Sequence, residues 1–336
     1  MADAFLSLKP QEQKEILQTA AAQLGRQAAV LEKDIWVCWV LQTLFSIPDA
    51  HPMAFKGGTS LSKVYDIIDR FSEDVDITLD YRHFGDDFDP FSPEVSKTKI
   101  RKFSDQLKGY VQTYANDVVV PAIKAAATSS LPGSTHNIRI DETGEKIWFG
   151  YPSVVENQDE YLKSEVLIEL GGRNVIDPNE QHEICPYVAS LTDGLEFPQA
   201  TVTVLSPSRT FWEKATLIHV ECNRGRLKES PDRLSRHWYD LTRIALHDTG
   251  ISAISDRALF EDVIKHKEAF YNASYAKYDE CSNGRLRLLP DDDEMPSLKA
   301  DYGKMIAAGM MYTAAPEFSE IIEQVREIEA KVNDWT

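Results

Sequence analysis

The sequence predicts an α+β fold, in which a small mixed sheet with helices is followed by a helical C-terminal half. Three observations support this class. Apolar residues recur at helical spacing near the N-terminus and through the last third. The middle of the chain carries several short runs of strand character. The chain has 336 residues, of which 43% are hydrophobic and 27% charged, which is enough for a sizeable core.

The N-terminal elements are indicated by periodicity. Residues 10–25 and 28–46 are expected to form two helices, because apolar residues return every three or four positions. The apolar piece 53–55 leads into a Gly-Gly turn and a second short helical pattern. Residues 74–79 alternate acidic or polar with apolar side chains, as a half-buried strand does.

The remaining elements are expected in a fixed order along the chain. Residues 85–93 are acidic and proline-containing and read as a loop, and 93–128 form one long helix or two joined helices. The polar stretch 279–297, with its acidic run at 291–294, is expected to be a solvated linker. The other expected strands are 136–141, 146–150, 163–170 and 200–205, and the other expected helices are 207–222, 231–247, 256–271 and 298–332.

Two domains are expected. Residues 1–205 would form a core with N-terminal helices, and residues 206–336 would form a helical domain that completes the active site. The four cysteines are scattered and form no zinc-binding spacing, as in a reducing cytoplasm. The N-terminus lacks a signal-peptide pattern, and no apolar run is long enough to span a bilayer. These features predict a cytoplasmic protein.

The charge balance restricts nucleic-acid binding. With 36 basic and 54 acidic residues, the net charge is −18, so the protein is not a generic coat for phosphate backbones. Binding to nucleic acid would need a local basic patch. The segment 207–243 carries an excess of basic residues, and Arg224 and Arg226 are expected in a loop between helices. We therefore assign this basic rim as the candidate acceptor-binding site.

The Gly-Gly turn is the first part of the candidate catalytic site. Gly57 and Gly58 allow a tight backbone approach, and Thr59 and Ser60 follow where a helix would begin. Exposed amides at such a position suit a triphosphate. Lys63 is expected in the first turn, where it would add a positive charge.

The second part is an acidic pair. Asp74 and Asp76 are two residues apart, so on a strand both side chains leave by the same face. Hard carboxylate oxygens suit Mg²⁺, which commonly takes one or two carboxylates together with substrate phosphates. Val75 and Ile77 would point into the core. A phosphate turn followed by a metal pair predicts nucleotide chemistry.

These residues resemble a known family. The stretch KGGTSL followed by RFSEDVDI is similar to the AbiEii-type toxins of the DNA polymerase β-like nucleotidyltransferase superfamily. Glu32-Lys33-Asp34-Ile35-Trp36 resembles a stretch that precedes the first core strand in that family. Glu213-Lys214 and the later Arg236-His237-Trp238-Tyr239-Asp240-Leu241 resemble two further motifs. Residues 84–135 and 250–336 match no motif.

The resemblance implies a set of site residues. Gly58 and Thr59 would hold phosphates, with Ser60 as an alternative, and Ser72 would lie near the nucleotide. Asp74 and Asp76 would bind Mg²⁺. Glu169, on the expected strand that also carries Glu165, would be a third acidic residue that activates the incoming hydroxyl. Lys214 would contact the triphosphate, and Asp240 would be a catalytic-site residue that orients Lys214. From the residues alone, Lys214 could equally be a surface lysine, and Asp240 could pair with Arg236 or Arg243.

The function implied by the resemblance is Mg²⁺-dependent transfer of a nucleoside monophosphate from an NTP, with the tRNA 3′ end as the acceptor. The protein would be the toxin of a bacterial toxin–antitoxin or phage-defence pair, and its partner an antitoxin of the DNA-binding regulator type. Two alternatives remain open: modification of a protein hydroxyl or a small molecule, and a non-catalytic nucleotide-binding module.

Overall fold

The computed structural model describes residues 3–84, 88–131, 133, 136–156, 162–192, 194–229 and 233–335. The chain divides into two compact units. The first comprises Met1–Val64, Phe71–Phe88 and Ser104–Val204, and the second comprises Tyr65–Arg70, Asp89–Phe103 and Leu205–Thr336. A division at residue 205 alone does not capture the two short earlier segments. They belong to the second unit because Arg70 pairs with Asp240 and Phe91 packs on His266.

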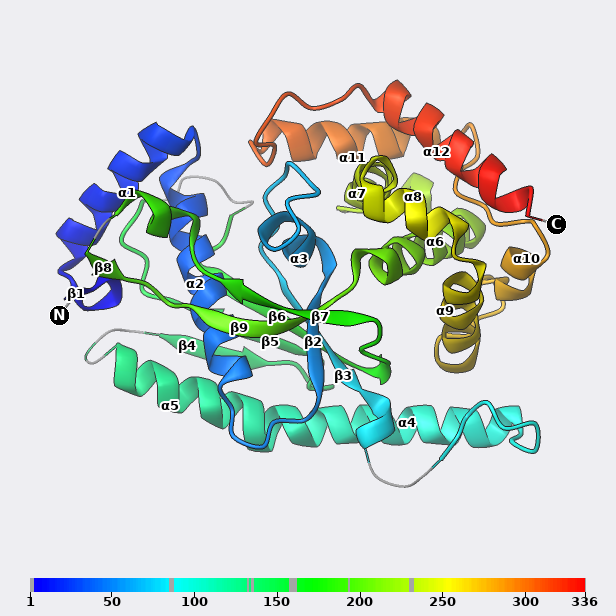
Figure 1. Ribbon diagram of the computed structural model, residues 1–336, viewed down its shortest axis with the longest axis horizontal. Helices are drawn as coiled ribbons and strands as arrows, with labels where there is room; N and C mark the ends of the chain where they lie inside the picture. The colour runs from blue at the N-terminus through cyan, green and yellow to red at the C-terminus, as the bar shows by residue number, and fades with distance from the viewer. Residues whose placement is uncertain are drawn as a thin grey trace. The chain divides into compact units, whose positions relative to one another are not determined.

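The first unit is built around a seven-stranded mixed sheet, which confirms the predicted α+β class (Figure 1). The strand order is β4-β5-β6-β3-β2-β9-β7. The central strand β3 pairs parallel with β6 and antiparallel with β2. The strands are β2 (Met53–Lys56), β3 (Val75–Asp80), β4 (Asn137–Ile140), β5 (Lys146–Gly150), β6 (Glu165–Asn174), β7 (Asn179–Ile184) and β9 (Ala200–Leu205), with β1 (Asp3–Ala4) and β8 (Leu195–Glu196) forming a separate parallel pair.

The helices of the first unit surround this sheet. They are α1 (Pro10–Leu24), α2 (Ala28–Phe45), α3 (Gly57–Lys63) and α5 (Val120–Ser130). A π-helical segment, Ala115–Val119, joins α5 to α4 (Lys97–Tyr114), so 97–130 is one continuous helical run that begins four residues later than the expected 93–128. Short 3-10 helices occur at Phe5–Ser7, Tyr81–His83 and Tyr187–Leu191.

Helix α2 forms the core with one face of the sheet. Its residues from Val30 to Leu41 are buried without interruption, as expected for a helix enclosed on several sides. Trp39 stacks on Phe149 of β5 with ring centroids 4.7 Å apart. Val75 and Ile77 of β3 are buried, whereas Asp76 between them is half-buried. The period of two therefore places Val75 and Ile77 on one side of β3 and Asp76 on the other.

The second unit is helical. Its elements after α4 are α6 (Pro207–Arg224), α7 (Ser235–Leu246), α8 (Asp248–Ser255), α9 (Arg257–Phe270), α10 (Tyr278–Ser282), α11 (Met295–Ala307) and α12 (Phe318–Asn333), with a 3-10 turn at Leu227–Glu229. Buried Trp238 of α7 donates its indole N–H to the carbonyl of Leu288, 2.9 Å away. This bond fastens the extended 284–290 stretch to the helices. None of the described helices combines the length and apolar character needed to cross a membrane.

Several expected boundaries are wrong. The expected single helix 298–332 is two helices, because Gly309 at φ +66° and Pro316 interrupt it. Strand β7 was not expected, since only one of its six residues is buried and its sequence shows little apolar alternation. The expected linker 279–297 contains α10 and the start of α11. Residues 85–87 of the expected loop and 231–232 of the expected helix lie outside the described residues.

Candidate functional site

Four charged residues form a row across the first unit's sheet. The register pairs Lys56 with Asp76, Asp76 with Glu169, and Glu169 with Lys146. Residues paired in register share a sheet face, so two neighbouring carboxylates lie between two lysines. Lys146 Nζ is 2.9 Å from Glu169 Oε1, and this contact is the main reason that the pKa of Lys146 is raised. The charge of Asp74 raises that pKa further.

Gly57 lies directly against the carboxylate of Asp76 in this row. It has φ +83°, and a Cβ atom built on it would lie 2.0 Å from Asp76 Oδ2. Any side chain at this position would therefore collide with the carboxylate. The glycine of the turn therefore lets the Asp76 carboxylate rest against the backbone of the turn.

The hydroxyls after the glycines point inward. Thr59 is 2% exposed, its hydroxyl donates to the carbonyl of Asp74 at 2.6 Å, and its Oγ1 lies in hydrogen-bond contact with Ser72 Oγ at 3.0 Å. Ser60 is fully buried and donates to the carbonyl of Gly57 at 3.0 Å. The placement of these side chains does not support direct phosphate contacts. Their bonds instead join the turn to the segment before β3.

Lys63 is not in the first turn of its helix, as was expected, but is the last residue of α3. Its side chain is 3% exposed, and its Nζ pairs with Asp34 Oδ1 at 2.6 Å and lies 4.2 Å from the ring centroid of Tyr187. Burial opposes the charge, but Asp34 outweighs it and the pKa of Lys63 is raised. Lys63 therefore remains a buried cation whose counter-charge is Asp34, and its contact with phosphate stays a prediction.

Lys214 and Asp240 meet in the second unit. Lys214 Nζ donates to Asp240 Oδ2 at 2.8 Å, and both side chains are buried. Arg70 binds the same carboxylate with two hydrogen bonds of 2.7 Å. Burial opposes the charge of Asp240, but the two cations outweigh it and hold its pKa well below the usual range. Burial lowers the pKa of Lys214.

The cation that binds Asp240 most fully was not foreseen. The sequence favoured Arg236 or Arg243 as its partner on helical spacing, whereas Arg70 comes from a segment 170 residues away. Arg243 binds Asp69 at 2.8 Å. The arginine in the stretch RFSED was a usable signal, because it lies only four residues before Asp74. Lys146 gave a weaker signal, since a lysine that begins a strand is common on any surface.

Two arginines of the basic rim, Arg224 and Arg226, are exposed in the second unit. Arg224 is the last residue of α6 rather than a loop residue, and Gly225 follows it at φ +69°. The guanidinium of Arg224 donates to Glu221 Oε1 and to the hydroxyl of Tyr275, both at 2.9 Å. Arg226 is exposed. Asp232, an acidic residue of the same segment 207–243, lies outside the described residues.

The acidic row fits a magnesium ion that is shared with a substrate. No group of three or more His, Cys, Asp or Glu side chains in the described ranges forms a metal site by itself. Mg²⁺ needs only one or two carboxylates when phosphate oxygens supply other ligands. Asp74 and Asp76 would provide these, and the missing side chain of Gly57 leaves room for the carboxylate of Asp76 against the turn.

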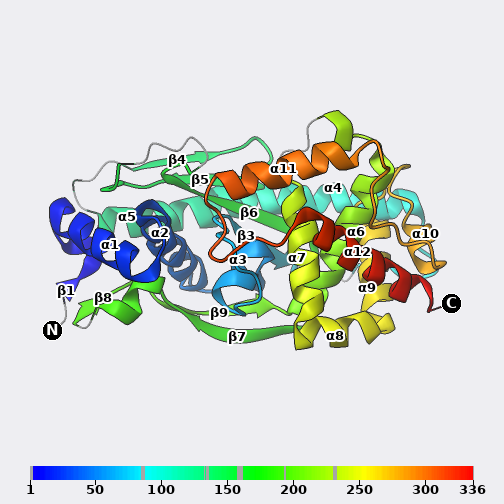
Figure 2. The same ribbon diagram turned by 90° about the horizontal axis from the view of Figure 1, so that it is seen from above.

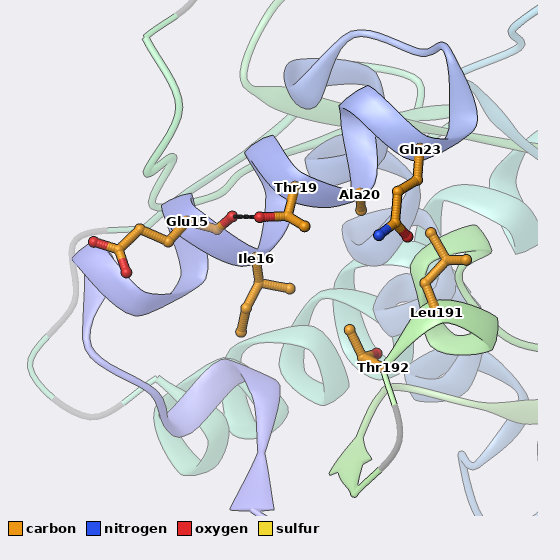
Figure 3. Close-up of a pocket in the computed structure, with 7 residues that line it drawn as sticks. All are labelled: Glu15, Ile16, Thr19, Ala20, Gln23, Leu191 and Thr192. Carbon is orange, nitrogen blue, oxygen red and sulfur yellow. Dashed lines mark hydrogen bonds between the residues drawn. The ribbon is translucent and has the colours of Figure 1, made fainter.

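A separate pocket of about 220 Å³ lies between α1 and the 3-10 helix Tyr187–Leu191 (Figure 3). It is lined by Glu15, Ile16, Thr19, Ala20, Gln23, Leu191 and Thr192. None of the expected site residues is among them. Its lining has one carboxylate, Glu15, and neither a lysine nor an arginine, so it is not the candidate active site.

Comparisons with known proteins give a family and a similar fold. A family model described as nucleotidyl transferase AbiEii toxin, type IV toxin–antitoxin system, matches residues 39–324. The fold is similar to that of MenT4, a nucleotidyltransferase toxin from Mycobacterium tuberculosis H37Rv, with a TM-score of 0.50 and 16% identity. That similarity covers 95% of this chain and 90% of MenT4. No curated protein matches the chain by sequence. Because the family match spans most of its length, the chain belongs to the AbiEii family of nucleotidyltransferase toxins of type IV toxin–antitoxin systems.

Proposed function

We propose that the protein transfers a nucleoside monophosphate from an NTP to the 3′ end of tRNA, and that Asp74 and Asp76 hold the Mg²⁺ this reaction needs. The observation that carries the proposal is the placement of Asp76 between Gly57 and Glu169. It supports the proposal because the proposed metal ligand Asp76 lies against a glycine and is paired in register with Glu169, the proposed base.

The proposed reaction is a substitution at the α-phosphorus of the NTP. The acceptor hydroxyl oxygen forms the new bond, the bond to the β-phosphate oxygen breaks, and pyrophosphate leaves. Glu169 accepts the hydroxyl proton, and Lys146 steadies Glu169 through the 2.9 Å contact. The backbone at Gly57 and Gly58 lies along the triphosphate near Ser72, and Lys214 contributes positive charge to it. When bound, Mg²⁺ neutralises phosphate charge and orients the reacting groups.

The type IV family implies an antitoxin partner and a nucleotide substrate. We propose that the antitoxin is a DNA-binding regulator and that the pair serves phage defence. Arrest of bacterial growth on expression of the wild-type toxin, without arrest by an Asp74→Ala form, would support the toxin role. Harmless expression of an active enzyme would instead favour a housekeeping reaction on a small molecule.

The decisive experiment incubates the protein with total RNA, Mg²⁺ and each labelled NTP in turn, followed by gel separation. Label on tRNA that is lost with EDTA supports the proposal. Label on protein, or in a small product, would identify the alternative acceptors. Tight NTP binding without release of pyrophosphate would indicate a non-catalytic nucleotide-binding module.

A further inference from the structure

Three consecutive charged residues are buried in helix α2, which packs against the sheet (Figures 1 and 2). Glu32, Lys33 and Asp34 are 4%, 3% and 3% exposed. Charged side chains are almost never buried to this degree unless they are paired. Successive residues on a helix point about 100° apart, so the three side chains reach three different parts of the first unit.

Lys33 binds the segment that precedes Asp74 and Asp76. Its Nζ donates to Glu73 Oε2 at 2.5 Å and to the carbonyl of Lys163 at 3.0 Å. The side chains of Lys33 and Glu73 are 4% and 7% exposed. Glu73 lies between Ser72 and Asp74 in the chain. This ion pair therefore ties the backbone next to the proposed metal ligand to the most enclosed helix of the unit.

Asp34 is connected to the glycine turn through α3, the helix that begins at this turn. Asp34 Oδ1 accepts from Lys63 Nζ at 2.6 Å, and Oδ2 accepts from the backbone N–H of Tyr187 at 2.7 Å. Lys63 is the last residue of α3, which begins at Gly57. The bond from Thr59 to the carbonyl of Asp74 then joins the two tethered segments to each other.

Glu32 has equal burial but different partners. It accepts from Ser153 Oγ and from the backbone N–H of Val154, both at 2.6 Å. The segment around 153 carries none of the residues assigned to nucleotide or metal binding. Glu32 is therefore a matched internal control, because its loss removes a buried charged contact of the same helix without touching the proposed site.

We infer that Lys33 and Asp34 are positioning residues for the nucleotide site, Lys33 through Glu73 and Asp34 through Lys63. The inference rests on the proposed function. Two like-charged carboxylates, Asp74 and Asp76, repel each other, so their backbone must be held for both to bind one ion. Supporting contacts of this kind set metal affinity because they fix the ligands before the metal arrives.

The first test measures hydrogen exchange of the whole protein in the absence of nucleotide. In Lys33→Met, peptides covering 71–76 should exchange roughly tenfold faster than in wild type, and in Asp34→Asn the same should hold for 57–64. In Glu32→Gln the faster exchange should be confined to 153–155. Glu73→Gln removes the charge of the partner of Lys33 in the same ion pair. It takes the place of Lys33→Met in this test if Lys33→Met does not fold.

The second test measures transfer activity against Mg²⁺ and NTP concentration. Lys33→Met and Asp34→Asn should raise the Mg²⁺ concentration for half-maximal rate by about 10–100-fold. Glu32→Gln should leave it unchanged, even where the melting temperature falls equally. Lys33→Arg, which keeps a cation for Glu73, should recover part of the Mg²⁺ affinity.

The outcomes separate the two ideas. A wild-type protein without Mg²⁺-dependent transfer overturns the proposed function, and hydrogen exchange still decides whether the tethers hold these segments. The positioning role is overturned if 71–76 exchanges at the wild-type rate in the folded Lys33 or Glu73 variants. It is also overturned if Glu32→Gln raises the Mg²⁺ requirement as much as Lys33→Met does.

Discussion

The carboxylate of Asp76 occupies the space that a side chain on Gly57 would need, with Oδ2 2.0 Å from the position of a Cβ atom. We therefore expect Gly57→Ala to displace Asp76 and to lower the transfer rate by about two decades or more, measured under saturating NTP. Gly25→Ala is the matched control. Gly25 also has a positive φ, +63°, but a Cβ there meets nothing within 4 Å. Equal transfer rates of Gly57→Ala and Gly25→Ala would show that Gly57 does not support the proposed metal site.

Asp74→Asn and Asp76→Asn should each abolish transfer while leaving the fold intact. Loss of a metal ligand removes several kcal/mol of transition-state stabilisation, about three decades in rate. Glu165→Gln is the control, because Glu165 lies on β6 like Glu169 but pairs with Arg139 at 2.6 Å. Pyrophosphate release and circular dichroism would be measured together. Full activity of either folded aspartate variant would remove the metal assignment.

Lys214→Ala should raise the NTP concentration needed for half-maximal rate. A lost charge-assisted hydrogen bond is worth about 1.5–3 kcal/mol, or roughly ten- to a hundredfold. Lys214→Arg should restore only part of this, because a guanidinium differs in shape and hydration. Melting temperature must be followed in parallel, since Lys214 also binds Asp240. An unchanged NTP dependence with a lower melting temperature would show that Lys214 only stabilises the second unit.

Asp240 should make stability sensitive to acid. Arg70 and Lys214 hold its native pKa below the unfolded value of about 3.9. The unfolded chain then binds more protons as pH falls, so this contribution is complete above about pH 5 and is lost below it. Urea unfolding from pH 6 to pH 3 should show a steeper loss in wild type than in Asp240→Asn. Asp291→Asn, at an exposed pair with Arg287, should keep the wild-type slope.

The basic rim should contribute to tRNA binding. Arg224→Glu with Arg226→Glu should weaken tRNA affinity and flatten its salt dependence, by at most about one log–log unit per lost contact. NTP binding should stay nearly unchanged. The matched variant is Lys99→Glu with Lys102→Glu, an exposed basic pair on α4 with the same charge change. If only this second pair weakens tRNA binding, the acceptor lies along α4 instead.

Local patterns predicted much of the fold. The period of two in 74–79 predicted strand β3, and it correctly divided Val75 and Ile77 from Asp76. Helical spacing predicted α1 and α2 to within a residue. The single helix expected over 298–332 failed because apolar periodicity continues on both sides of Gly309 and Pro316. Periodicity records which face is buried, but not where the chain turns.

The sequence by itself determined the family, the acidic pair and the glycine turn, because these depend on residue types at short, fixed spacings. The tertiary structure alone decided the partners of the buried charges. Arg70 was brought to Asp240, Lys63 to Asp34, and Lys33 to Glu73. A buried charge must be paired, but its partner can come from any distance along the chain. The ion pairs of the folded chain therefore decide which lysine and arginine side chains can bind a substrate. Local sequence patterns do not contain this information.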